Sequence, residues 1–151
     1  MEIPVEKNKE YIVEILDNGC QGEGIAKIEG YTIFVEGAIK GEKIKIKILK
    51  ILKTHAFGKI IEIIKESEKR KEPDCDTYKR CGGCNLRHIE YEETLKIKKE
   101  IVQNLINKTL KEKIKIENTI GMENPYNYRN KAIYPVRNKQ RRKSSIWSIR
   151  K

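Results

Sequence analysis

The sequence predicts a mainly β protein: a small five-stranded barrel, then a cysteine loop, an amphipathic helix and the first strands of an incomplete α+β domain. Three observations support this fold class. Apolar and polar residues alternate in short segments of residues 1–64, and glycines separate these segments. Three of the four cysteines fall within residues 75–84. After residue 91, apolar side chains recur at three- and four-residue spacing, which is typical of a helix.

The barrel strands follow from the alternation along residues 1–65. YIVEILD alternates, EGYTIFVEGA is a β-rich stretch bounded by glycines, and AFGKIIEII supplies the fifth strand. In EKIKIKILKI, Ile44, Ile46 and Ile48 share one face. Beyond Leu49 the alternation slips by one residue, as at a β-bulge or a barrel corner. Five short strands in about sixty residues suit a closed barrel of the oligonucleotide/oligosaccharide-binding type.

The opposite face of the same strand carries Lys43, Lys45 and Lys47. Lysines in this arrangement can follow the phosphates of a nucleic acid, so they are the candidate nucleic-acid contacts of the barrel. The alternative is that they only solvate the outer face of the barrel, and the residues alone favour this alternative.

A charged connector that ends in a proline, residues 65–74, marks the domain boundary.

A helix with a structural role is expected over residues 91–112. Residues 113–121 (KIKIENTIG) then return to strand alternation. Residues 124–138 (NPYNYRNKAIYPVRN) predict a loop that enters a further strand, because the two prolines exclude a helix. The apolar residues that define the helix are Leu95, Val102, Leu105, Ile106 and Leu110.

The chain is therefore expected to have four parts. These are a barrel at residues 1–65, a linker with the cysteine loop at 66–90, a helix with the start of a central domain at 91–138, and a basic tail at 139–151.

The composition excludes a membrane-spanning class. The chain has no run of 18 apolar residues, and its N-terminus lacks the apolar core of a secretory signal. We therefore expect a cytoplasmic protein whose thiols stay reduced. In that compartment a clustered set of cysteines favours a metal or catalytic site over a disulfide framework.

The net charge of +11 is unevenly distributed. Residues 129–151 hold nine Lys and Arg and no Asp or Glu, whereas residues 1–64 are balanced. A basic pI near 9.4 is typical of proteins with a polyanionic partner. A basic tail can also be merely solvated, so the charge alone is weak evidence for RNA binding.

The cysteine spacing Cys-x5-Cys-x2-Cys, formed by Cys75, Cys81 and Cys84, indicates a metal site. Iron–sulfur clusters often take three thiolates from one loop and a fourth from far away, so the spacing favours iron–sulfur over zinc. Cys20 is a possible distant fourth ligand, although an ordinary cysteine in a β-turn is the favoured interpretation. A structural zinc site of the three cysteines and His88 is a further alternative.

These residues carry a resemblance. NGCQGEGIAKIEGYTIFVEGAIKGEKIKIKILKILKTHAFGKIIEII resembles a TRAM domain, a small RNA-binding β-barrel. CDTYKRCGGCNLRHIEYEETLKIKKEIV resembles the iron–sulfur segment of the bacterial RNA uracil-5-methyltransferases, and NPYNYRNKAIYPVRN resembles the start of their central RNA-recognising domain. The three motifs occur in the family's order over about residues 8–138.

The resemblance implies an enzyme that uses S-adenosylmethionine to methylate carbon 5 of a uridine in 23S ribosomal RNA. It assigns Cys75, Cys81 and Cys84 as three ligands of a 4Fe-4S cluster, whose fourth cysteine lies beyond this chain. RNA contacts are expected at residues 129–131, namely Arg129, Asn130 and Lys131.

No catalytic residue is expected in this chain, because the family's cofactor loop, nucleophilic cysteine and base belong to a downstream domain. S-adenosylmethionine would bind only in a full-length enzyme, and this chain alone is expected to be inactive. Residues 139–151 depart from the family pattern, as a frameshift or truncation would produce. The alternative is a stand-alone RNA-binding accessory protein with a zinc or iron–sulfur loop and no enzymatic activity.

Overall fold

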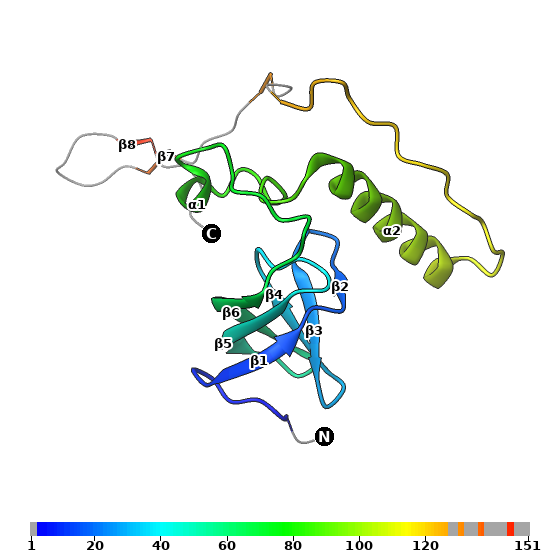
Figure 1. Cartoon of the computed structure of the whole chain (residues 1–151). Coiled ribbons are helices and arrows are strands. Elements are labelled where there is room, and N and C mark those ends of the chain that lie inside the picture. The colour runs from blue at the N-terminus through cyan, green and yellow to red at the C-terminus, as the bar shows by residue number, and fades with distance from the viewer. Residues whose placement is uncertain (1–2, 127–129, 132–135, 138–144, 147–151) are drawn as a thin grey trace.

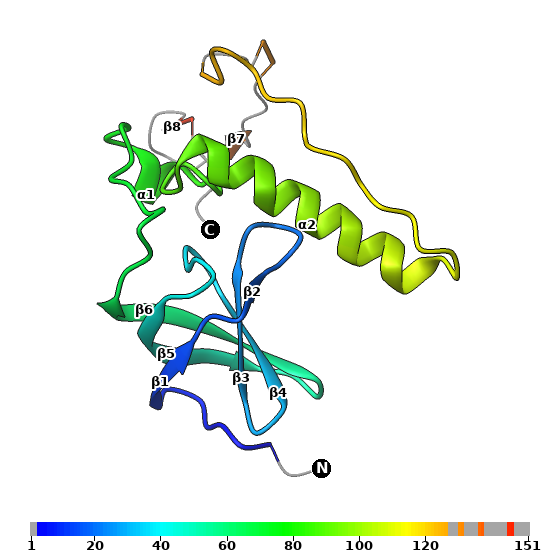
Figure 2. The same cartoon turned by 45° about the vertical axis from the view of Figure 1, so that its right-hand side comes forward.

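The structure is a computed structural model that describes residues 3–126, 130–131, 136–137 and 145–146. A β unit formed by residues 3–65 is followed by the cysteine loop and a long helix that lies across one end of this unit (Figures 1 and 2). The elements are β1 (Glu10–Glu14), β2 (Asp17–Asn18), β3 (Gly24–Ile28), β4 (Tyr31–Val35), β5 (Lys43–Ile51), β6 (His55–Lys65), α1 (Tyr78–Cys81), α2 (Tyr91–Thr109), β7 (Val136–Arg137) and β8 (Ser145–Ile146).

The first six strands form one sheet in the order β1-β5-β6-β4-β3-β2. All neighbours are antiparallel except β4 and β6, which are parallel. The expectation of five strands was therefore wrong by one, because the two-residue strand β2 is too short to produce a visible alternation.

The expected closed barrel is also not formed by strand pairing. Within the described residues no ladder joins the edge strands β1 and β2. The chain itself connects these edges through Ile15 and Leu16, whose amides donate to the carbonyls of Glu42 at 2.9 Å and Ile25 at 2.8 Å. The sheet is thus strongly curved, and the segment of Ile15 and Leu16 joins its edge strands β1 and β2.

The alternation predicted for β5 is confirmed. Ile44, Ile46 and Ile48 are fully buried, whereas the lysines between them point outward. The register between β5 and β6 shifts between Ile48 and Lys50, which is the expected slip beyond Leu49. The isoleucines pack in one core with residues from the other strands, including Val13, Ile15, Ala26, Ile33, Val35, Ala38 and Ala56.

A buried ion pair holds the connector against the β unit. The Glu42 side chain is fully buried, and its two oxygens accept hydrogen bonds from Nε and Nη2 of Arg70, each at 2.7 Å. The backbone amide of Ile39 donates to the same carboxylate at 2.8 Å, and Arg70 also donates to the carbonyl of Gly37. Burial alone would raise the pKa of Glu42, but these hydrogen bonds outweigh it and lower the pKa below its ordinary value.

A second, smaller core docks the helix. Ile39 from the β unit, Ile89 from the loop and Ile97 from α2 are all buried against one another. Next to them, an isolated antiparallel bridge pairs Arg70 with Ile89. The helix predicted over residues 91–112 is present but ends at Thr109, where the next residue becomes extended. No helix among the described residues is long and apolar enough to cross a membrane.

The strand expected over residues 113–121 was wrong. This segment is extended but belongs to no strand, and it runs back along α2 (Figures 1 and 2). Gln103 of α2 replaces a strand partner, because its amide donates to the Ile114 carbonyl and accepts from the Ile116 amide, each at 2.8 Å. Within the residues that the structure describes, the further strand expected after the proline-rich loop consists of the two-residue β7, which pairs with β8.

Replacing Arg70 with leucine is expected to destabilise the protein strongly. The substitution leaves the Glu42 carboxylate buried without its charge partner, and such a loss costs about 3–5 kcal/mol. Urea unfolding at pH 7, followed by circular dichroism, measures the change. Glu66→Gln is the matched control, because it removes only an exposed carboxylate 3.7 Å from Arg70. A loss below about 1 kcal/mol for Arg70→Leu would contradict the central role of the pair.

Candidate nucleic-acid interface

The lysine face predicted on β5 points outward but is partly neutralised. The Nζ of Lys45 lies 2.8 Å from a carboxylate oxygen of Glu10, and Glu62 lies opposite Lys45 on β6. The hydrogen bond between Lys45 and Glu10 raises the pKa of Lys45 and lowers that of Glu10. Both side chains are well exposed, so the ion pair adds little stability. It nevertheless neutralises the charge of Lys45, the middle lysine of this face.

The other two lysines belong to like-charged cross-strand pairs. Lys47 lies opposite Lys59, and Lys43 lies opposite Lys65, on the antiparallel strands β5 and β6. Like charges directly opposite one another destabilise a sheet. These four residues, called here the lysine strip, are therefore a surface on which a bound polyanion would relieve repulsion.

An aromatic cluster on the neighbouring strands was not predicted from the sequence. Phe34 on β4 lies in register with Phe57 on β6, and their ring centroids are 5.9 Å apart. His55 meets both rings edge to face, at 5.3 Å and 5.2 Å. The sequence shows the aromatic residues at alternate strand positions, but only the parallel pairing of β4 with β6 brings them together.

A hollow of about 330 Å³ lies beside this cluster. Phe34, Leu49, Phe57 and Gly58 line it from the sheet. Its rim is formed by residues 21–23, Glu36 and Asn85. Asn85 belongs to the cysteine loop, and its side-chain amide donates to the Gln21 carbonyl at 2.9 Å, so the loop is anchored to the rim of the hollow.

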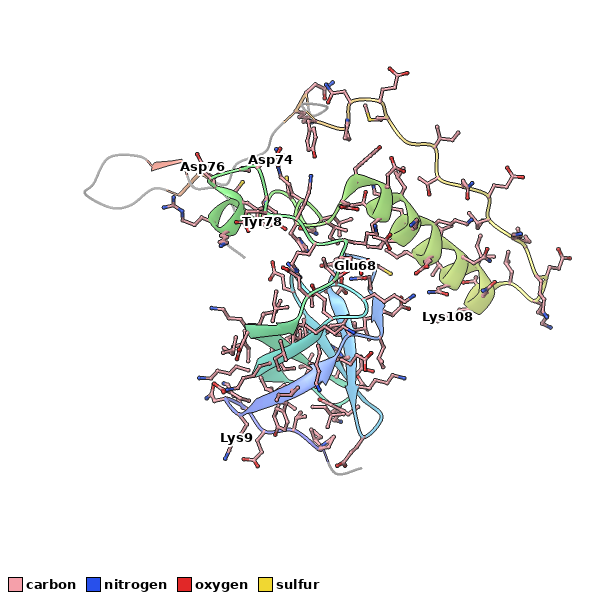
Figure 3. The ribbon with its side chains drawn as sticks, in the orientation of Figure 1. Lys9, Glu68, Asp74, Asp76, Tyr78 and Lys108 are labelled. Atoms are coloured by element: carbon pink, nitrogen blue, oxygen red, sulfur yellow. The ribbon has the colours of Figure 1, made fainter. Side chains whose placement is uncertain are left out.

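The cysteine loop is built around the short helix α1. Cys75 precedes α1, Cys81 is its last residue, and Gly82 ends it with a left-handed φ of 66° that turns the chain toward Cys84. The Thr77 hydroxyl bonds the Cys75 sulfur at 3.4 Å and lowers the pKa of the Cys75 thiol. Figure 3 shows Asp74, Asp76 and Tyr78 in this loop, apart from the six-stranded sheet.

Arg87 joins the two ends of the loop, a role that no pattern in the sequence indicated. Its Nε donates to Asp74 at 2.7 Å, and its guanidinium lies 5.1 Å from the centre of the Tyr126 ring. The pKa of Arg87 is raised, first by its hydrogen bond to Asp74 and further by the neighbouring Cys84 and Cys75.

The described conformation does not bring the predicted metal ligands together. Among the residues that the structure describes, no group of three or more His, Cys, Asp or Glu could hold a metal ion. Cys20 lies exposed in the turn between β2 and β3. All four cysteines are free thiols.

His88, the alternative zinc ligand, is buried beneath the loop. Its Nδ1 bonds the Tyr78 hydroxyl at 2.6 Å, and its Nε2 is buried without a partner among the described residues. Burial, helped by the nearby Arg70 charge, lowers the pKa of His88 to about 4. The ring is therefore neutral at physiological pH.

The RNA contacts predicted in the central domain are not brought to this surface by any described element. Asn130 and Lys131 are exposed and lie outside the helices and strands. Arg129 and most of the tail at 139–151 lie outside the described residues, apart from the two residues of β8.

Comparison with known proteins finds a family model that matches the β unit. Residues 4–61 match the family model of the TRAM domain. The chain is also similar to proteins named uncharacterised RNA methyltransferases. It is 49% identical to one from Clostridium acetobutylicum over 137 residues, 45% to one from Clostridium tetani over 135, and 42% to one from Staphylococcus epidermidis over 133.

These alignments cover 87–89% of this chain but only 29–30% of each relative, so the chain spans about a third of their length. A conserved protein of Methanococcus maripaludis, solved in solution, is 42% identical, with a TM-score of 0.39; the match covers 40% of this chain and 86% of that protein.

The stability of the protein is expected to fall between pH 7 and pH 5 because of His88. In this range the unfolded chain takes up a proton at His88, with an ordinary pKa near 6.5, whereas the folded chain does not until about pH 4. The loss amounts to about 2 kcal/mol. Urea unfolding of the wild type and of His88→Gln at both pH values measures it. The variant should lose most of this pH dependence, while His55→Gln should retain it; an unchanged pH dependence in His88→Gln would refute the assignment.

Proposed function

We propose that this chain is the RNA-binding portion of an S-adenosylmethionine-dependent RNA uracil-5-methyltransferase. The proposal starts from the TRAM match over residues 4–61 and from the 42–49% identity to proteins named RNA methyltransferases. The enzyme's target is a uridine in ribosomal RNA. The TRAM match carries the RNA-binding part of this proposal. The enzyme class, the cofactor and the target base rest on the resemblance of the cysteine segment and of residues 124–138 to that family.

The lysine strip supports RNA binding on physical grounds. Lys47 and Lys59 face each other across β5 and β6, so phosphates placed between them gain attraction and remove repulsion. Lys45 contributes less, because its charge is already matched by Glu10. In this proposal the chain holds the substrate RNA, and the methyl transfer takes place in the part of the enzyme that carries the cofactor.

We also propose that Cys75, Cys81 and Cys84 supply three thiolates to an iron–sulfur cluster. The chemistry of the donor set favours it, since three thiols in one loop suit such a cluster. The described conformation does not fit a bound cluster, because the thiols are not gathered around one point. The loop would have to rearrange on binding, and no step of RNA recognition is assigned to the cluster.

The double substitution Lys47→Ser/Lys59→Ser is expected to weaken binding of a fluorescent single-stranded RNA. Two lost phosphate contacts should reduce the slope of log affinity against log salt by about 1.4, since each contact to a single strand contributes about 0.7. Fluorescence anisotropy at several salt concentrations measures affinity and slope together.

The matched control for this experiment is Lys108→Ser/Lys111→Ser. It removes the same charge from exposed residues at and just beyond the end of α2, where Figure 3 shows Lys108. The control should leave the slope nearly unchanged. Equal effects of the two double variants would place the RNA elsewhere, and the absence of RNA binding by the wild type would refute the proposed function.

Anaerobic reconstitution with iron and sulfide is expected to give a broad brown absorbance that bleaches quickly in air, since three thiolates leave one iron open. Cys84→Ser should abolish the absorbance, and Cys20→Ser should leave it intact. His88→Ala is the deciding variant. If the isolated protein carries tightly bound zinc that His88→Ala releases, the loop is a Cys3His zinc site and the iron–sulfur proposal fails.

A further inference from the structure

We propose that the outer face of β4 and β6 is a stacking platform for unpaired bases, so that the RNA held by this chain is single-stranded where it crosses the β unit. The platform consists of Phe34, His55 and Phe57. This inference rests on the proposed RNA-binding function and adds the structural class of RNA segment that the β unit recognises.

The first support is the exposure of the rings. Phe57 is 41% exposed, and the adjacent Leu49 is 47% exposed, whereas Ile44, Ile46 and Ile48 on the other face of β5 are fully buried. An aromatic cluster on the outward face therefore adds nothing to the core. Aromatic side chains on the open face of a small β unit can stack with nucleic-acid bases, whatever their sequence.

The second support is the distribution of charge around the platform. Lys50 lies in register with Phe57, and the next outward pair along the same strands is Lys47 and Lys59. On the other side, Lys27 of β3 lies opposite Thr32, which is itself in register with His55. Cationic side chains thus flank the rings on both sides. A single RNA strand that stacks its bases on the rings needs such charges beside them to bind its phosphates.

The third support is the chemistry of the hollow beside the rings. Two carboxylates, Glu23 and Glu36, lie on its rim, and such groups disfavour a phosphate while they accept hydrogen bonds from base edges. The volume of about 330 Å³ is at the small end of the range for ligand pockets, which suits a base rather than a peptide helix. The hollow therefore favours the base side of a strand, with the phosphates held at the lysine strip.

The test compares two RNA probes that carry the same phosphates: an eight-nucleotide oligouridine and an abasic strand of the same length. The full chain should bind the abasic strand roughly tenfold more weakly, because the stacking contribution is lost. Phe57→Leu should weaken oligouridine binding by a similar factor and leave binding of the abasic strand unchanged. Phe57→Tyr, which keeps a ring, should retain most of the wild-type affinity.

The outcomes separate this inference from the proposed function. If the wild type binds both probes equally, or if Phe57→Leu binds oligouridine as tightly as the wild type, the platform is refuted while RNA binding stands. If neither probe binds with salt-dependent affinity, the proposed function itself fails. Thermal melting verifies that Phe57→Leu is folded. Sedimentation of the wild type and the variant tests whether the rings instead pair two copies of the chain, and such pairing would also overturn the proposal.

Discussion

The arrangement of the chain beyond the first 65 residues depends on one buried carboxylate. Glu42 lies fully inside the protein, where an ionised group is stable only if charge and hydrogen bonds compensate it. Arg70 supplies both through two hydrogen bonds, and the backbone amides of Ile39 and Ser67 donate to the same carboxylate. The connector must therefore return to the β unit at one defined place, and the contact of Ile89 and Ile97 with Ile39 follows from that return. Figure 3 shows Glu68 in this connector, between the sheet and the cysteine loop.

The outer face of the six-stranded sheet combines three kinds of surface within a few residues. Lys45 is matched by Glu10, and Lys47 and Lys59 repel each other. The ring of Phe57 lies two residues from Lys59 on β6, next to the ring of Phe34 on β4. None of these arrangements contributes to the hydrophobic core, which is made by the opposite faces of the same strands. Repelling charges and exposed rings reduce stability, and such features are typical of ligand-binding surfaces.

Local patterns in the sequence predicted the parts of the fold that local physics determines. The alternation of β5, the slip beyond Leu49 and the helix beginning at residue 91 are all present, because burial of one face dictates each of them. The strand expected at 113–121 failed because a strand requires a neighbouring ladder, and here the neighbour is a helix whose Gln103 satisfies the backbone instead. The aromatic platform and the role of Arg87 depend on contacts between segments far apart in the chain, which no single segment reveals.

The hydrogen bond from Asn85 to the Gln21 carbonyl links the cysteine loop to the turn between β2 and β3. The next residues along both segments are closely packed as well, because a Cβ atom at Gly22 would come within 2.4 Å of Leu86. The cysteine loop therefore packs directly against the rim of the hollow. Binding linkage is reciprocal. A conformation of the loop that raises the affinity for RNA is itself favoured, by the same factor, when RNA is bound. In the proposed RNA complex, the cysteine loop would therefore border the bound strand at the rim of the hollow, where Asn85 of the loop already lies.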